Sequence, residues 1–171
     1  MGPMRTLFVM RRAKSDWNAD YERDHDRPLN ERGVRGARLM GRVLSAEGRV
    51  PQLVMTSTAV RARSTAALAN EAGTWDAEIV LDANLYGTGA DAAVQAASMA
   101  PDIERLMLVG HQPAWSILVS VLTGELVDMK TATVSVVDFD IDEWSGIPGS
   151  RAELAATFQP RDYLDGEYDH R

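Results

Sequence analysis

Short apolar runs along the chain alternate with longer stretches in which apolar residues recur at helical spacing. Residues 6–10 and 52–56 are mainly apolar, the pattern of strands buried on both faces of a parallel sheet. A helical pattern follows each run, over residues 30–48 and 59–72. The chain therefore opens with two strand–helix units.

The alternation continues in the second half of the chain. Residues 78–81 give a weaker strand pattern, and residues 90–99 are rich enough in alanine to predict a short helix. Residues 105–109 again form a buried-strand run, and residues 114–122 predict a helix that ends at Gly124.

The last two strands differ in character. Residues 131–141 alternate and are rich in Val and Thr, and a Gly-Ile-Pro-Gly turn predicts that they pair with residues 153–158. We expect an α/β fold, a three-layer α/β/α sandwich with a mostly parallel central sheet and an antiparallel strand pair at its C-terminal end. Residues 4–161 would form this single domain, with residues 1–3 a cloning remnant and the polar residues 162–171 a flexible tail.

Composition limits the chemistry that the domain can carry. The 171 residues include no cysteine and three histidines, His25, His111 and His170, which excludes disulfides, thiol nucleophiles and thiolate metal sites. His25 stands between two aspartates, which favour its charged form. His170 lies in the expected tail, and we expect it to be inert.

The formal net charge is −7, which argues against a general nucleic-acid or anionic-membrane surface. The sequence has no apolar run of about 18 residues and no signal-peptide pattern at its start, so we expect a cytoplasmic protein. A monomer is the default expectation for a small acidic domain with its own core.

Three segments place unusual polar residues directly after buried strands. They are Arg11-Arg12, the stretch from Ser57 to Arg61, and Gly110-His111. In open α/β sheets, ligands bind in the crevice beyond the carboxyl ends of the strands. Guanidinium groups and an imidazole that face one crevice describe an anion pocket, and phosphate matches the bidentate geometry of arginine.

Each segment also has a purely structural interpretation. Arg11 and Arg12, taken alone, are typical of the solvated edge of a sheet. Arg61 and Arg63 are typical of the exposed first turns of a helix, although the helix dipole disfavours cations there. His111 alone is more often a core histidine that bonds nearby backbone. A single crevice would explain all three segments, which favours the functional interpretation.

Other chemistries have weaker support, and we expect no metal and no cofactor. A serine hydrolase would need a Gly-x-Ser-x-Gly elbow, which is absent, and the sequence places no serine convincingly beside His111. Gly87 and Gly89 lack the Lys-Ser/Thr that follows in a phosphate-binding loop. The acidic residues that could be considered as metal ligands follow the alternation of a strand, as a solvated strand face does. They are Asp138, Asp140, Asp142 and Glu143.

The polar segments belong to longer motifs that occur in a familiar order. The first is Leu-Phe-Val-Met-Arg-Arg-Ala-Lys-Ser-Asp-Trp over residues 7–17, and the others are residues 24–29 before Arg32-Gly33, then 56–66, 84–86, 109–113 and 130–132. Together they resemble the histidine phosphatase superfamily, whose hallmark is Arg-His-Gly or Arg-His-Ala directly after the first strand. Within it, the chain is most similar to the small SixA-type phosphohistidine phosphatases.

The resemblance implies a phosphoryl pocket built by Arg11, Arg61 and His111. In the family, a histidine at position 12 attacks phosphorus, forms a covalent phosphohistidine and is freed by water. The implied substrate is a phosphorylated histidine on a protein, such as a phosphotransfer domain, or a small phosphate ester. Candidate accessory residues are His25, Ser57 and Asp16.

Position 12 is arginine in this chain. A guanidinium group has a pKa above ~12 and no acceptor lone pair, so Arg12 cannot make that attack. Loss of a covalent nucleophile costs about 10⁴–10⁶ in turnover. A second departure is Thr58, where the family usually has proline, which affects loop rigidity more than chemistry.

Three interpretations of Arg12 stay open on the sequence alone. The first is a phosphatase by descent whose activity is reduced or rerouted, through direct attack by water or with His25 as a substitute nucleophile. The second is a pseudophosphatase that binds phosphate or phosphohistidine without turnover, with Arg12 as an added cation. The third is a single-base change in an ordinary phosphatase, because one base interconverts histidine and arginine codons.

Overall fold

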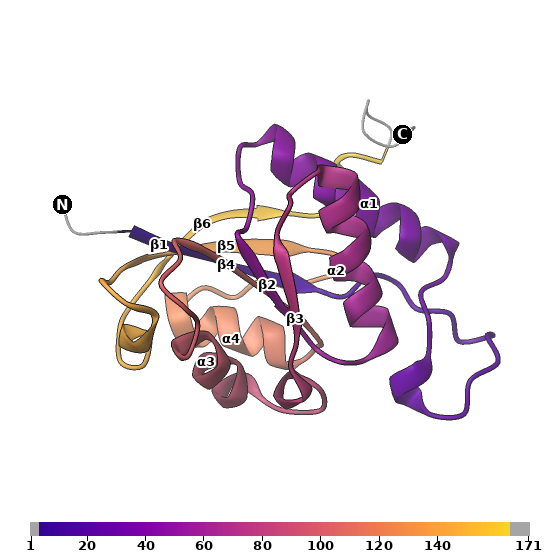
Figure 1. Cartoon of the computed structure of the whole chain (residues 1–171), viewed down its shortest axis with the longest axis horizontal. Helices are drawn as coiled ribbons and strands as arrows, with labels where there is room; N and C mark the ends of the chain where they lie inside the picture. Colours follow the sequence, from indigo (N-terminus) through magenta and orange to yellow (C-terminus); the bar gives the residue numbers. More distant parts are fainter. Residues whose placement is uncertain (1–3, 165–171) are drawn as a thin grey trace.

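Six strands form one sheet in the order β3-β2-β4-β1-β5-β6 (Figure 1). The computed structural model describes residues 4–164. The strands are β1 (Met4–Arg11), β2 (Leu53–Thr56), β3 (Glu78–Leu81), β4 (Arg105–Gly110), β5 (Val134–Asp140) and β6 (Glu153–Phe158). The first four in the spatial order are parallel, whereas β5 is antiparallel to β1 and β6 is antiparallel to β5. The predicted mostly parallel sheet with an antiparallel C-terminal pair is confirmed.

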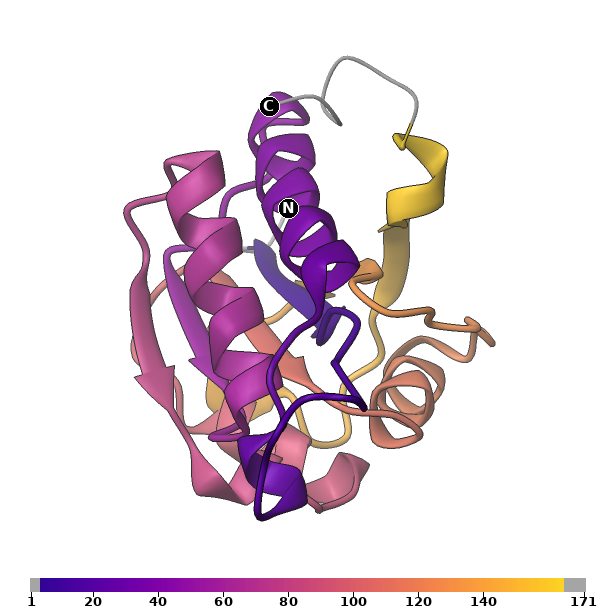
Figure 2. The same cartoon turned by 90° about the vertical axis from the view of Figure 1, so that its right-hand side faces the viewer.

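Helices cover both faces of this sheet, which makes three layers (Figures 1 and 2). One face packs against α1 (Glu31–Ala46) and α2 (Val60–Gly73), and the other against α3 (Ala90–Ser98) and α4 (Ala114–Thr123). Four short 3₁₀ turns complete the elements: η1 (Asp24–Asp26), η2 (Ala83–Leu85), η3 (Trp144–Gly146) and η4 (Pro160–Asp162).

The alternation of side chains along β1 explains why its sequence is continuously apolar. Leu7 and Val9 belong to the core under α3 and α4, whereas Phe8 and Met10 belong to the core under α1 and α2. All four are at most 1% exposed. A strand covered on both faces has no position at which a polar side chain would reach water.

Glycines let α1 approach its neighbours closely. A Cβ atom on Gly41 would lie 2.2 Å from the carbonyl oxygen of Ala69 in α2. A Cβ atom on Gly33 would lie 2.0 Å from the carbonyl oxygen of Lys14, directly after β1. Both distances are far below van der Waals contact, so α1 is held against α2 and against the chain that leaves β1.

The ends of several elements differ from the expected ones. The strand expected from residue 131 begins only at Val134, because Ala132 has a φ of +61° and its N–H donates to the carbonyl oxygens of both Arg11 and Arg12. The expected tail begins within η4. The expected remnant at residues 1–3 and the tail beyond residue 164, including His170, lie outside the described residues. No helix within residues 4–164 has both the length and the apolar composition needed to cross a membrane.

Candidate functional site

The register of the sheet brings the polar segments to one edge. Arg11 at the end of β1 pairs with Gly110 at the end of β4, and Thr56 at the end of β2 pairs with Val109. The N–H of Arg12 donates to the carbonyl oxygen of Gly110 at 2.9 Å. Arg12, Ser57 and His111 therefore leave three adjacent parallel strands at the same edge, where ligands bind in open α/β sheets.

Arg61 joins this edge from the first turn of α2. Its side chain is buried, and its two terminal nitrogens donate to Asp24, one to the carbonyl oxygen at 2.7 Å and one to Oδ2 at 2.9 Å. Asp24 also accepts hydrogen bonds from Arg27 and, at 2.9 Å, from the hydroxyl of Tyr86. One carboxylate thus ties α2 to the long loop that precedes α1.

Arg27 gives that loop its own framework. Its guanidinium carbon lies 3.6 Å from the ring centroid of Trp17, and its Nε donates to Ser15 Oγ at 2.9 Å. The residue is only 3% exposed although the loop is at the surface. Stacking and hydrogen bonding therefore hold the loop in a defined path, with Asp24 directed to Arg61.

The edge carries an excess of positive charge. Burial, followed by repulsion from Arg11 and Arg61, lowers the pKa of Arg12 to about 10. Burial also lowers the pKa of Arg11, opposed by the carboxylate of Asp128. Both side chains remain charged at neutral pH, so the arginines repel one another in a partly desolvated space, which a bound anion would relieve.

Asp24 and His111 respond to these arginines in opposite ways. Partial burial raises the pKa of Asp24, but hydrogen bonds from Tyr86 and Arg61 outweigh it and bring the pKa to about 2. Burial, followed by repulsion from Arg61 and Arg12, lowers the pKa of His111 to about 4. At neutral pH the site therefore holds an ionised carboxylate and a neutral imidazole.

Buried nitrogens without partners concentrate at this edge. Within residues 4–164, six buried side-chain polar atoms lack a hydrogen-bond partner, and four of them are Arg11 Nε, Arg12 Nε, Arg61 Nε and His111 Nδ1. Buried polar groups in folded proteins are nearly always paired, so unpaired groups gathered at one place point to a ligand. We refer to these four residues as the phosphoryl site, after the group that the family resemblance described above implies for them.

Ser57 lies beside His111, which corrects the expectation that no serine does. Ser57 Oγ is 2.8 Å from His111 Nε2. The two residues are far apart in the sequence, but each follows the end of one of two paired parallel strands. Because Ser57 is fully buried, its position supports a role in orienting the imidazole rather than in attacking a substrate.

His25 lies one aromatic ring away from His111. The ring of Tyr86 contacts both, with its centroid 4.9 Å from that of His25 and 5.7 Å from that of His111. His25 Nε2 is 2.8 Å from Thr58 Oγ1, and His25 Nδ1 is 3.6 Å from a carboxylate oxygen of Asp26. Both ring nitrogens of His25 therefore face groups on the protein.

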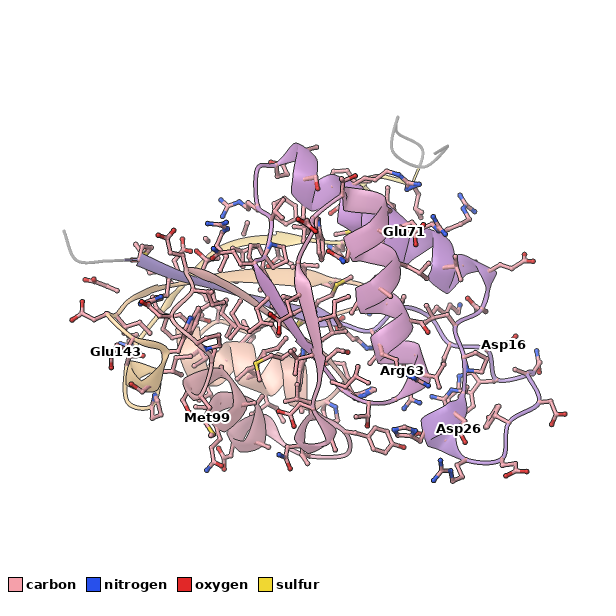
Figure 3. The ribbon with its side chains drawn as sticks, in the orientation of Figure 1. Asp16, Asp26, Arg63, Glu71, Met99 and Glu143 are labelled. Atoms are coloured by element: carbon pink, nitrogen blue, oxygen red, sulfur yellow. The ribbon has the colours of Figure 1, made fainter. Side chains whose placement is uncertain are left out.

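Three other residues named from the sequence have different surroundings. Asp16 accepts a hydrogen bond from the backbone N–H of Asn18 on the outer loop, and Arg63 is exposed on α2 (Figure 3). Asp138 lies on β5, where it accepts a hydrogen bond from Thr6. No group of acidic residues and histidines within residues 4–164 is arranged to hold a metal ion.

The sequence alone assigns no role to Tyr86, and it does not distinguish Asp24 from an ordinary solvated loop charge. Asp24 contacts Arg61 and Arg27, and Tyr86 donates a hydrogen bond to Asp24 from the end of η2. These contacts depend on the path of the long loop, which no periodic pattern encodes. The available signal was the motif Asp-His-Asp-Arg-Pro-Leu over residues 24–29, because an Asp and an Arg three residues apart are placed to pair.

Comparison with known proteins identifies the family. Residues 7–90 match the model of the histidine phosphatase superfamily, branch 1. An uncharacterized chloroplastic protein of Arabidopsis thaliana is 30% identical over 150 residues, which cover 82% of this chain and 69% of the relative. An uncharacterized protein of Mycobacterium tuberculosis is 40% identical over 116 residues, which cover 67% of this chain and 70% of the relative.

Solved structures agree with this match. A protein of Nakamurella multipartitia, provisionally assigned as the phosphohistidine phosphatase SixA, is 30% identical and superposes with a TM-score of 0.80. The superposition covers 92% of this chain and 96% of that one. The chain therefore belongs to the histidine phosphatase superfamily, branch 1, and is a SixA-type member in sequence and fold.

Proposed function

We propose that the phosphoryl site binds the phosphoryl group of a phosphorylated histidine on a partner protein and that the protein, like its family, hydrolyses it. The observation that carries this proposal is the set of four unpartnered buried nitrogens on Arg11, Arg12, Arg61 and His111. A phosphoryl group has three oxygens that accept hydrogen bonds and carries negative charge. It would pair these donors and relieve the repulsion among the arginines.

The choice of phosphohistidine as substrate is supported by family membership. The SixA-type relative of known structure carries the name of a phosphohistidine phosphatase. Release of an imidazole from phosphorus needs little acid assistance. A small phosphate ester presents the same phosphoryl group and is expected to bind less tightly, because it lacks the surrounding protein surface.

Arg12 decides what happens after binding. Its NH1 donates to the carbonyl oxygen of Ala13 at 3.1 Å, its Nε is buried, and it lies among Arg11, Arg61 and Arg27. A charged guanidinium group offers five donors and no lone pair, so it adds a cation where the family's nucleophile would stand. Covalent transfer to residue 12 is therefore closed.

The position of Arg12 also supports a second candidate function, binding without turnover. Because residue 12 cannot act as the nucleophile, hydrolysis would require a water molecule to attack phosphorus directly. The new P–O bond would form as the P–N bond breaks, and a proton from the water would pass to the leaving imidazole nitrogen. His111 could take up a proton in that step only against the repulsion of the neighbouring arginines.

The experiment compares the protein with its Arg12→His variant. Both are assayed for release of inorganic phosphate from a phosphorylated phosphotransfer domain and from an aryl phosphate, and both are titrated with inorganic phosphate by calorimetry. We expect both to bind phosphate and the histidine variant to gain at least about 10³-fold in turnover. His111→Ala and Arg61→Ala should weaken binding in either background.

The outcomes separate the two functions. Substantial turnover by the Arg12 protein, lost in His111→Ala, would overturn binding without turnover and support hydrolysis by water. Absence of phosphate binding in both proteins would overturn the assignment of the phosphoryl site itself.

A further inference from the structure

A second basic surface lies beside the phosphoryl site. A groove of about 160 Å³ is lined by side chains from the chain after β1, the first turn of α1, the turn before β5 and η4. Among residues 4–164, its charged lining residues are Lys14, Arg32, Lys130 and Arg161, and none of its lining residues is acidic. We call it the basic groove.

The basic groove is joined rigidly to the phosphoryl site. Ala13, in its wall, directly follows Arg12, and Ala132, also in its wall, donates its N–H to the carbonyl oxygens of Arg11 and Arg12 at 3.1 Å. The close approach of Gly33 to Lys14 fixes α1 against the same segment. A ligand in the phosphoryl site and a group in the groove would therefore lie at a fixed separation.

The positive charge of the groove is only partly compensated. Lys130 Nζ is 2.8 Å from the exposed carboxylate of Asp128, and Arg161 also interacts with Asp128. In the part of the chain that the structure describes, neither Lys14 nor Arg32 is in an ion pair. This concentration of cations stands out in a chain of net charge −7 and is complementary to an anionic partner.

The floor and size of the groove narrow the class of partner. Ala13 and Ala132 are nearly completely buried beneath it, and Leu164 and Pro160 add apolar walls. The volume equals that of about five water molecules at ~30 Å³ each. An apolar floor with a cationic rim suits the aliphatic stem and carboxylate of a glutamate, because the stem covers apolar surface while the charge meets lysine and arginine.

We infer that the basic groove binds acidic side chains of the protein whose phosphorylated histidine enters the phosphoryl site. This inference rests on the proposed function and adds a substrate class to it: phosphohistidine flanked by acidic residues. The groove then supplies specificity and faster association, while the phosphoryl site supplies the contact common to all phosphorylated substrates.

The test uses two synthetic peptides that share a stable phosphoryl-triazole analogue of phosphohistidine. They differ at three flanking positions, glutamate in one and glutamine in the other. At low ionic strength we expect the full-length protein to bind the glutamate peptide about tenfold more tightly, with the difference shrinking as salt screens the charges.

Matched variants locate the effect. Lys14→Gln combined with Arg32→Gln should reduce the preference to about twofold and leave the affinity for the glutamine peptide unchanged. Arg49→Gln combined with Arg151→Gln removes the same charge from the opposite end of the sheet and should keep the preference. Loss of preference in both double variants would show a general charge effect and overturn the inference.

Three further outcomes would also overturn it. Equal affinity for the two peptides, with inorganic phosphate still bound, would remove the groove's role and leave the proposed function intact. A second bound equivalent of inorganic phosphate that disappears in the Lys14→Gln, Arg32→Gln variant would assign the groove to phosphate. Tighter peptide binding after neutralising Asp165, Glu167 and Asp169 would assign it to the chain's own C-terminal residues.

Discussion

Ser57 Oγ is 2.8 Å from His111 Nε2 and 3.2 Å from the backbone N–H of Ala59. The N–H of Ala59 can only donate, so it uses one acceptor position of the hydroxyl. The hydroxyl proton of Ser57 can then be donated to Nε2, and we predict that Nε2 is the lone-pair nitrogen of the neutral ring. In that tautomer the remaining proton of His111 is on Nδ1, the buried nitrogen without a partner, from which an anion could accept it.

Removing the Ser57 hydroxyl should raise the pKa of His111. In Ser57→Ala, no donor stabilises the lone pair on Nε2, so protonation of the ring becomes easier and the pKa rises from its value of about 4. The measurement is an NMR titration of the imidazole signals. Thr58→Ala, which deletes the adjacent hydroxyl that contacts His25, should leave the titration of His111 unchanged. An unchanged His111 titration in Ser57→Ala would contradict the positioning role.

Anion binding should strengthen as the pH falls. Sulfate is a suitable probe because its charge is constant over the range used. A bound dianion raises the pKa of His111 above about 4, so binding takes up a proton and the sulfate affinity increases from neutral pH down toward pH 4. Because at most one proton is taken up, the sulfate affinity increases by no more than about tenfold per pH unit.

Calorimetric titrations with sulfate at several pH values would measure this slope. In the free protein, Asp24 has a pKa of about 2 and is ionised over this range. His111→Gln should bind sulfate with a flat profile. A slope that persists in that variant would assign the proton to another group.

Neutralising Asp24 should increase anion affinity. Its carboxylate occupies a terminal nitrogen of Arg61, so an incoming anion competes with it. We expect Asp24→Asn to bind sulfate about fivefold more tightly, because removal of a charge beside a half-buried anion is worth about 1 kcal/mol. Asp26→Asn removes the same charge from an exposed pair with Arg23 and serves as the control. Equal effects in the two variants would show that Asp24 does not compete at Arg61.

Two glycines in α1 should respond in opposite ways to the same substitution. Gly41→Ala forces a Cβ atom to 2.2 Å from the Ala69 carbonyl oxygen and should destabilise the protein by about 3 kcal/mol. Gly36→Ala meets only the Cβ atom of Ala132, at 3.8 Å, and should stabilise it by about 0.5–1 kcal/mol. Urea unfolding of the two variants gives the comparison. A similar loss of unfolding free energy in both variants would mean that the α1–α2 contact can relax around the added methyl group.

Local pattern was sufficient to predict the sheet and the edge at which the polar segments meet. Apolar runs such as residues 105–109 encode burial on both faces, and the carboxyl ends of adjacent parallel strands share one edge. This places Arg11 near His111 without knowledge of side-chain conformations. The start of β5 was harder to predict, because Ala132 adopts a positive φ that its residue type does not signal.

The partners within the site required the three-dimensional path of the long loop. Asp24 reaches Arg61 because Arg27 stacks on Trp17 and bonds to Ser15, a set of contacts without sequence periodicity. The pair formed by Ser57 and His111 depends on the order of strands, since β2 and β4 are adjacent although β3 separates them in the chain. Propensity does not encode that order.

The position of β4 between β1 and β2 also bears on how the protein is made. The ribosome releases β1 and β2 first, yet neither pairs with the other, and both pair with β4. A nascent chain that ends before residue 105 carries all three arginines of the phosphoryl site and lacks β4, the strand that brings them together. Anion recognition is therefore acquired late in translation, and a prematurely terminated product would keep the charge without the affinity.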